Sequence, residues 1–503
     1  MISTRSAQLD TDNAHCASLE PDGALMSGTI QFPSETRPTS SLATATSSPL
    51  AMVALLTLTG IYFIRPYEWV PGMIGFPLYQ WVMIPSLLVF FGKWTKGLSF
   101  AALKEFPISA CVVGLGAIVL ASEVINNAAI DATWGFAKVF LFYLLLIGIV
   151  DSKTKLTIFL QGYAAVLCGL AGLIWANHYG LVHLEMGYSV DAAMAPVDNV
   201  RIEALGGANF DPNDTAVLMV SGILVAGHFA TVARPLYLRP VWLAGAVAAA
   251  RVLQLTDSRG GFLALLVGLA VYTVVRWGKK GIWLGAATVP LVAASMATER
   301  MTGIGSALRE DTGQNRLQFW QSALVLFKQN PLLGSGPGGF MRHVGRAAHN
   351  TFLQAFAELG FVGGMLFLGA FVYAFLCMIR LAWTVARRRP YHDEDVEASD
   401  DESTPDGDES VLGGEQSPAV IPQAIPTAAL VAALLAAYGM GILALNHLFG
   451  TETYLILGLA TATAAVYHSS WRPLSSSLLV WGGAVSVAFI VASHVVARSM
   501  VRW

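Results

Sequence analysis

The chain has 503 residues, of which 55% are hydrophobic and only 13% are charged, and its mean hydropathy is +0.58. Soluble domains carry about 25% charged residues, so this composition excludes a soluble globular protein. It predicts an all-α, polytopic helical membrane protein. The formal net charge of -3 gives no sign of a nucleic-acid partner.

The first 48 residues form a polar segment that is rich in Ser and Thr and lacks the apolar core of a secretory signal. We interpret residues 1–48 as a disordered cytoplasmic tail. The four cysteines are scattered along the chain and have the spacing of neither a metal site nor a disulfide framework.

Long apolar segments follow the tail. A membrane-spanning helix needs about 20 mostly apolar residues, and this rule predicts about 12–13 transmembrane helices. The predicted segments are 50–64, 74–92, 106–125, 133–150, 156–175, 215–233, 238–255, 260–275, 281–297, 351–378, 425–446, 453–468 and 476–496.

These segments predict the domain layout of the chain. Residues 49–386 would form a transmembrane catalytic core, and 425–503 would form the C-terminal transmembrane helices. Between them, 387–424 would be an acidic, disordered cytoplasmic linker, because its core at 391–420 is a low-complexity run of Asp, Glu and Ser.

Lys and Arg in short loops predict the orientation, because they favour the cytoplasmic side. With the tail inside, the outer side receives loop 177–214, the turn at 256–261 and loop 298–350. Arg65, Arg498 and Arg502 would also lie outside, against the rule. The C-terminal exceptions leave open an error of one in the number of spans after residue 425.

Loop 298–350 is polar, cationic and rich in glycine. Leu317, Phe319, Trp320, Leu324 and Phe327 recur at helical spacing and predict a short amphipathic helix, which Asn330-Pro331 ends. The glycines that follow allow backbone to approach either backbone or a ligand closely; they are Gly334, Gly336, Gly338 and Gly339.

Arginines in the three outer segments point to a phosphate ligand. Guanidinium groups bind phosphate oxygens in pairs and stay charged, so we expect Arg201, Arg259 and Arg316 to bind a pyrophosphate. Ser258 and Gly260 flank Arg259, and backbone N–H groups there would contribute. Alternatively, Arg259 extends to the interface from a helix end, and Arg316 lies on a solvated helix face.

His349 is the candidate for acid–base chemistry, because His is the side chain best placed to accept a hydroxyl proton near neutral pH. In the alternative reading, His349 and Asn350 only cap the next helix, as Asp211 to Asp214 cap theirs. Supporting candidates are Asn213, Asn350, Arg346 and His343. The sequence contains no metal-binding or nucleotide-binding motif, so we expect no metal and no cofactor.

Three motifs in a fixed order carry a resemblance. SRGGFLALLVG, NRLQFWQSALVLFKQNPLLGSGPGGF and HNTFLQAFAELGFVG, preceded by GGANFDPND, resemble the O-antigen ligase and O-antigen polymerase superfamily over about residues 195–375. The resemblance implies a GT-C-type glycosyltransferase with a large periplasmic loop that contains short helices. It implies that Arg259 and Arg316 bind the donor pyrophosphate and that His349 assists the acceptor hydroxyl.

The same resemblance implies the substrates and the location. The donor would be an undecaprenyl-pyrophosphate-linked glycan, the acceptor a glycolipid or lipid-linked glycan, and the transfer inverting. The protein would lie in the bacterial inner membrane with its active site facing the periplasm. Ligase, polymerase and protein-glycosylating members share these motifs, and some relatives are described as bicarbonate transporters. We favour a ligase that uses lipid A-core.

Overall fold

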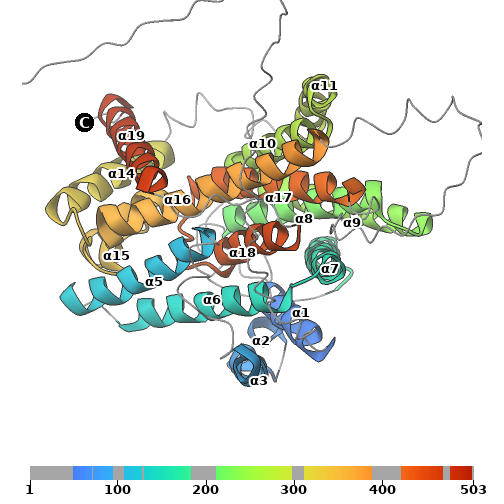
Figure 1. The fold of residues 1–503 in the computed structure, drawn as a ribbon, viewed down its shortest axis with the longest axis horizontal. Helices are drawn as coiled ribbons and strands as arrows, with labels where there is room; N and C mark the ends of the chain where they lie inside the picture. Colours follow the sequence, from blue (N-terminus) through green and yellow to red (C-terminus); the bar gives the residue numbers. More distant parts are fainter. Residues whose placement is uncertain are drawn as a thin grey trace, which may run out of the picture. The chain divides into compact units, whose positions relative to one another are not determined.

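The computed structural model describes residues 49–70, 72–94, 107–126, 130–182, 211–296, 311–387, 421–467 and 476–500. These residues form helices and no strands (Figure 1). The helices are α1 (Pro49–Ile64), α2 (Pro66–Trp69), α3 (Leu78–Trp94), α5 (Pro107–Asn126), α6 (Ile130–Ile149), α7 (Lys153–His178), α8 (Pro212–Val232), η4 (Leu236–Leu238), α9 (Arg239–Thr256), α10 (Arg259–Trp277), α11 (Lys279–Met296), α14 (Asp311–Gln329), α15 (Gly339–Val344), α16 (Thr351–Arg387), α17 (Ile421–Ile442), α18 (Thr451–Val466) and α19 (Ser476–Met500).

Every predicted apolar segment coincides with one of these helices. Nine helical stretches in the described part of the chain are long and apolar enough to cross a membrane, and Thr133–Ile149 of α6 and Thr451–Val466 of α18 are shorter apolar helices. The helices α3 and α11 occupy the remaining predicted segments. The prediction of an all-α polytopic membrane protein is therefore confirmed.

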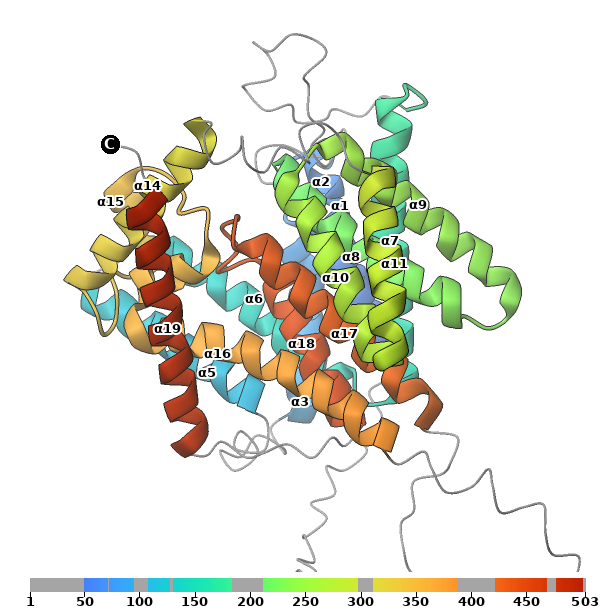
Figure 2. The same ribbon diagram turned by 90° about the horizontal axis from the view of Figure 1, so that it is seen from above.

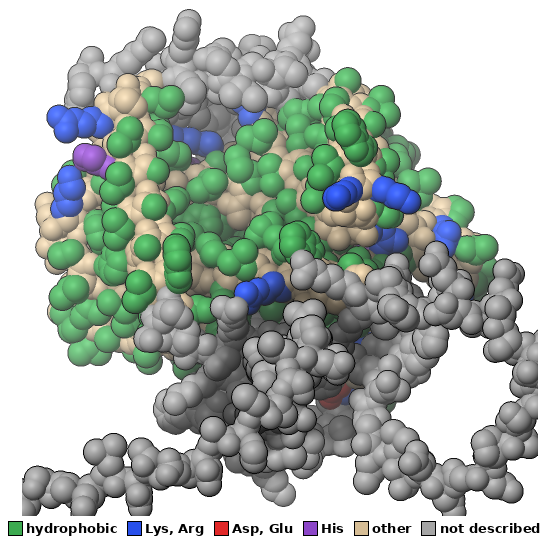
Figure 3. Space-filling model, turned by 45° about the horizontal axis from the view of Figure 1, so that its top comes forward, with side chains coloured by type: hydrophobic (Ala, Val, Ile, Leu, Met, Phe, Trp, Pro, Cys, Tyr) green, Lys and Arg blue, Asp and Glu red, His purple; other side chains and the backbone are tan. Residues whose placement is uncertain are grey.

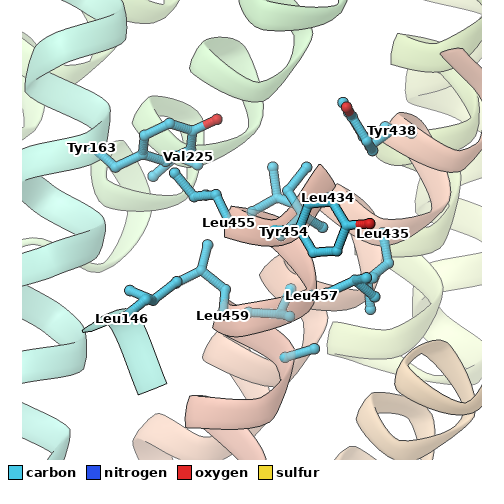
Figure 4. Packing of buried hydrophobic residues seen from close by; sticks show 14 of the residues in the cluster. Leu146, Tyr163, Val225, Leu434, Leu435, Tyr438, Tyr454, Leu455, Leu457 and Leu459 are labelled. Atoms are coloured by element: carbon cyan, nitrogen blue, oxygen red, sulfur yellow. The ribbon is translucent and has the colours of Figure 1, made fainter. Parts of the chain in front are cut away.

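The helix α18 lies at the centre of the core. Every residue from Thr451 to Ala464 is buried, and α18 packs against α5, α6, α7, α16 and α17. Figure 4 shows Tyr454, Leu455, Leu457 and Leu459 of α18 between side chains of its neighbours. Because α18 is buried on all sides, this short helix presents no surface to lipid.

The outer helices expose apolar side chains instead. Only 11% of the apolar stretch of α19 is buried, and Val480, Trp481 and Val491 on it are exposed. Figure 3 shows one face of the molecule on which hydrophobic side chains predominate and Lys and Arg form a few separate groups. Exposed apolar surface of this extent is what lipid chains cover in a membrane protein.

The predicted amphipathic helix in loop 298–350 is α14. It packs against α16 and α19, buries Leu317 and Leu324, and ends at Gln329, immediately before Asn330-Pro331. Phe327 meets Phe356 of α16 edge to face, with 6.0 Å between ring centroids. The prediction for this helix is confirmed, and its contacts fix the position of Arg316 on it.

The glycine-rich loop after α14 is part of the scaffold. Gly334 and Gly360 both have positive φ, 70° and 67°, and each lies directly against the backbone of the other segment. At Gly360 the path of α16 breaks, and the freed groups pair with the loop: Gly336 N–H donates to Glu358 C=O (2.9 Å) and Phe361 N–H to Pro331 C=O (2.7 Å). Here the glycines serve the approach of backbone to backbone.

A buried carboxylate completes this joint. The Glu358 side chain accepts hydrogen bonds from the N–H groups of Gly338 (3.1 Å) and Phe340 (3.2 Å) at the start of α15. The amide of Gln354 donates to it as well (3.2 Å). Because a helix N-terminus carries unpaired N–H groups and favours an anion, Glu358 fixes α15 onto α16.

The C-terminal helices have the predicted number. The end of α19 lies beside α14, where Gln321 donates to Ala497 C=O (2.9 Å) and Gln314 to Met500 C=O (3.3 Å), and Figures 1 and 2 both show the two helices side by side. The C-terminal end of α19 is therefore on the same side as loop 298–350. With loop 298–350 outside, as the charges of the short loops predict, Arg498 would lie outside as well, against the charge rule.

Candidate functional site

The N-terminus of α8 forms one wall of the candidate site. Asp211 caps this helix by accepting from the N–H groups of Asn213 (2.6 Å) and Asp214 (2.9 Å), and the Asp214 side chain accepts in return from Asp211 N–H (3.3 Å). This reciprocal arrangement is a capping box. The expected capping role is confirmed, and it places two carboxylates together.

The turn before α10 is joined to this wall. The Ser258 hydroxyl donates to the side-chain oxygen of Asn213 (2.8 Å) and accepts from Gly261 N–H (3.2 Å), so that Ser258 caps α10. Gly261 packs against Ala216 of α8. Arg259, the first residue of α10, is partly exposed, and the bond from Ser258 to Asn213 fixes where α10 begins relative to α8.

His349 precedes α16 in a left-handed conformation, with φ 47°. This region costs a non-glycine residue of order 1–3 kcal/mol, and such strain gathers at functional sites. Asn350 is the cap of α16, since its side chain accepts from Leu353 N–H (3.1 Å). The expectation of a cap is confirmed for Asn350, while the ring of His349 is left to face Phe319 of α14, at 6.2 Å between centroids.

Several charges act on His349. Burial lowers the pKa of its imidazole, the Arg316 guanidinium lowers it further, and Asp211 and Asp214 raise it, with a net pKa below the ordinary 6.5. His349 is therefore mostly uncharged at neutral pH and able to accept a proton.

A cavity of about 460 Å³ brings His349 and the two carboxylates together. His349, Asp211 and Asp214 line it, with Gln354 of α16 and residues 445–450 before α18. The residues that line the cavity belong to segments that the predicted topology places on one side of the membrane. The structure thus joins at one end of the helices the loops that we expected to be outer loops.

Arg65 also lines the cavity, although its place in the sequence marks it only as an exception to the charge rule. It has φ 50°, donates to Glu68 (3.0 Å) and to Tyr62 C=O (3.3 Å), and lies over the Tyr62 ring at 5.6 Å. A cation on the disfavoured side of the membrane was the signal that could have marked it.

His447 and Glu452 were missed as site residues. Both line the cavity; His447 Nε2 lies 2.8 Å from Asp214 Oδ1, 233 positions away in the sequence, and Glu452 accepts from Ser221 of α8 (3.2 Å). An ionisable residue in a hydrophobic stretch is a candidate for function by default. Both residues stand in the short connection between the predicted segments 425–446 and 453–468, so this signal did not mark them as site residues.

Neither Arg259 nor Arg316 is among the residues that line the cavity, and the remaining candidates lie outside the lining as well. Arg346 and His343 are exposed and outside the cavity lining, and Nδ1 of His343 lies 2.7 Å from Gly339 C=O. Gly260 lies against Ala444 rather than in the lining. Arg201 lies outside the described residues. Among the described residues, no group of three or more His, Cys, Asp or Glu is arranged to hold a metal ion.

Comparison with protein families matches part of the chain. Residues 244–368 match the family described as O-antigen ligase. This segment belongs to the O-antigen ligase superfamily. No curated protein matches the chain. The resemblance expected from the motifs is thus confirmed for a segment that contains Arg259, Arg316 and His349.

The O-antigen ligase segment covers part of the candidate site. It begins within α9 and ends within α16, so it includes the turn before α10, the whole of α14 and the His349 turn. The capping box of α8, Arg65 and the segment around His447 lie outside it. The site residues outside the matched segment are joined to it by the hydrogen bonds and the cavity described above.

Proposed function

We propose that the protein is a membrane glycosyltransferase of the O-antigen ligase type. It moves a glycan from undecaprenyl pyrophosphate to an acceptor hydroxyl, on the periplasmic side of the bacterial inner membrane, with inversion and without a metal. The observation that carries this proposal is the position of His349, which lines one cavity together with the two carboxylates of the α8 capping box. Burial and the charge of Arg316 lower the pKa of His349, which favours the form that accepts a proton.

The donor pyrophosphate binds to Arg259 and Arg316 in this proposal. Arg316 stands on α14, which two neighbouring helices hold in place, and Arg259 stands at a turn that is fixed to α8 through Ser258 and Asn213. The N–H groups at the start of α10 add a partial positive charge. Because the pyrophosphate leaves with an electron pair, cations fixed before the reaction stabilise the charge that develops.

His349 accepts the proton of the acceptor hydroxyl. The acceptor oxygen then forms a bond to the anomeric carbon, and the bond from that carbon to the pyrophosphate oxygen breaks. Asp211 and Asp214 favour the imidazolium that forms, since both raise the pKa of His349. A general base of this kind contributes about 10²–10⁴-fold to a rate.

Purified protein in lipid tests this function directly. Wild-type protein with an undecaprenyl-pyrophosphate glycan and lipid A-core should produce glycosylated lipid A-core. Products with two joined lipid-linked repeat units would instead assign a polymerase. If no acceptor led to release of undecaprenyl pyrophosphate and vesicles that contain the protein took up bicarbonate, a transporter would replace the enzyme.

A further inference from the structure

The cavity wall contains a chain of hydrogen bonds that starts at a backbone carbonyl. The Thr453 hydroxyl lies 2.7 Å from His447 C=O and 2.8 Å from the Tyr438 hydroxyl. The Tyr438 hydroxyl lies 2.9 Å from His447 Nδ1, and His447 Nε2 lies 2.8 Å from Asp214 Oδ1. Each of these groups has a limited number of protons, so the direction of every bond can be worked out.

The carbonyl of His447 can only accept a hydrogen bond, so the Thr453 hydroxyl donates its single proton to it. Tyr438 must then donate its own proton to Thr453. Because the single proton of the Tyr438 hydroxyl is donated to Thr453, this hydroxyl can only accept from His447. Nδ1 of His447 therefore carries a proton. If His447 had no second proton, the lone pair of Nε2 would face a carboxylate oxygen at 2.8 Å.

The Asp214–His447 pair therefore holds one more proton than a neutral imidazole beside a carboxylate. Asp214 has two reasons to stay ionised: it lies in the first turn of α8, where the helix favours an anion, and its other oxygen accepts from Asp211 N–H. The additional proton belongs on Nε2 of His447.

We propose that His447 is an imidazolium paired with the Asp214 carboxylate, and that this ion pair is a positioning pair that holds Asp214 towards His349. This inference rests on the proposed function. As His349 takes the acceptor proton, the fixed carboxylate stabilises the imidazolium that forms on it. The charges of the pair itself do not change in the reaction.

The groups around His447 are consistent with a cation. Burial lowers the pKa of His447, but the hydrogen bond to Asp214 and the charges of Asp214, Glu452 and Asp211 outweigh burial and raise the pKa above the ordinary value. The charged or titratable groups that share the cavity with it are Asp211 before α8, Asp214 on α8, Glu452 on α18, His349 before α16, Tyr62 on α1 and Arg65 after α1. Tyr438 on α17 contacts its ring directly.

This pairing predicts an alkaline limb in the pH profile of kcat. A group whose pKa is raised keeps its proton at low pH and loses it as the pH rises through the folded pKa. Without that proton, Nε2 repels Asp214 and the carboxylate leaves its position. Activity should therefore fall at alkaline pH, in addition to the fall at acid pH where His349 becomes charged.

Variants at two positions test the limb. His447→Gln removes the positive charge of the pair, so kcat should fall about ten- to a hundredfold with little change in the donor KM. Because Gln keeps an N–H donor for Asp214 at every pH, the alkaline limb should vanish. Tyr438→Phe leaves Nδ1–H without its acceptor and should move the limb to lower pH. His228→Gln is the matched control, because His228 has a Tyr272 partner (3.0 Å) and pairs with no carboxylate among the residues that the structure describes.

The charge can be measured without activity. In protein with ¹⁵N-labelled histidine, the signals that change in Tyr438→Phe and are lost in His447→Gln belong to His447, and both ring nitrogens should be protonated at neutral pH. A bare ring nitrogen would overturn the ion pair whatever the transfer assay gives. An alkaline limb that survives in His447→Gln would overturn the positioning role and leave the proposed function intact.

Discussion

Replacement of Arg316 by Ala should have two separable effects. It removes charge-assisted hydrogen bonds to the donor pyrophosphate, which are worth about 1.5–3 kcal/mol, or about a ten- to hundredfold loss of kcat/KM. It also removes a cation that lowers the pKa of His349. Because that pKa should then rise, the acid limb of the kcat profile should move to higher pH.

Arg316→Lys separates the two effects. Lys keeps the charge beside His349 but lacks the planar fork that holds two phosphate oxygens, so the acid limb should stay in place while kcat/KM recovers only in part. Arg251→Ala is the matched control, since Arg251 is exposed on α9 and bonds to Tyr179 and Gln254.

The assay is transfer from an undecaprenyl-pyrophosphate glycan across a range of pH, with donor binding and thermal melting measured on the same samples. A lower melting temperature in proportion to the lost activity would refute the reasoning and make Arg316 a structural residue. So would an acid limb that stays in place in Arg316→Ala.

Three further predictions concern topology, metal and fold. A single cysteine at Arg346 should react with an impermeant thiol reagent from the periplasmic side and one at Lys280 only after the membrane is opened; the reverse pattern would invert the proposed orientation. Transfer should persist in excess EDTA, and activity that returns only with Mg²⁺ or Mn²⁺ would contradict the metal-free mechanism. Gly334→Ala should destabilise the fold by at least about 2 kcal/mol in thermal melting, because the backbone there is left-handed and the new methyl group would overlap with the backbone of Glu358. Gly345→Ala is the control: its φ is 71° but the space around it is open, so only the cost of the backbone conformation should appear.

The helices could be predicted because length and hydropathy are local properties of the chain. The capping box at Asp211, the cap at Asn350 and the amphipathic α14 follow from spacings of a few residues, and the structure has all of them. The His349 turn was found because its motif stands in one continuous stretch.

The rest of the site depends on contacts between distant segments. No local pattern pairs His447 with Asp214 or brings Arg65 to the same cavity. The glycine-rich loop left two readings open, since close approach to a ligand and close approach to backbone require the same residue. The break of α16 at Gly360 and the Glu358 carboxylate decide for the backbone, and neither could be derived from the loop alone.

The central claim is that His349 removes the acceptor proton, and a single-turnover measurement on His349→Ala tests it most directly. Transfer from bound donor should slow by about 10²–10⁴-fold, while donor affinity and melting temperature stay close to wild type. His178→Ala, at an exposed histidine at the end of α7, is the control. Near wild-type turnover in His349→Ala would contradict the account.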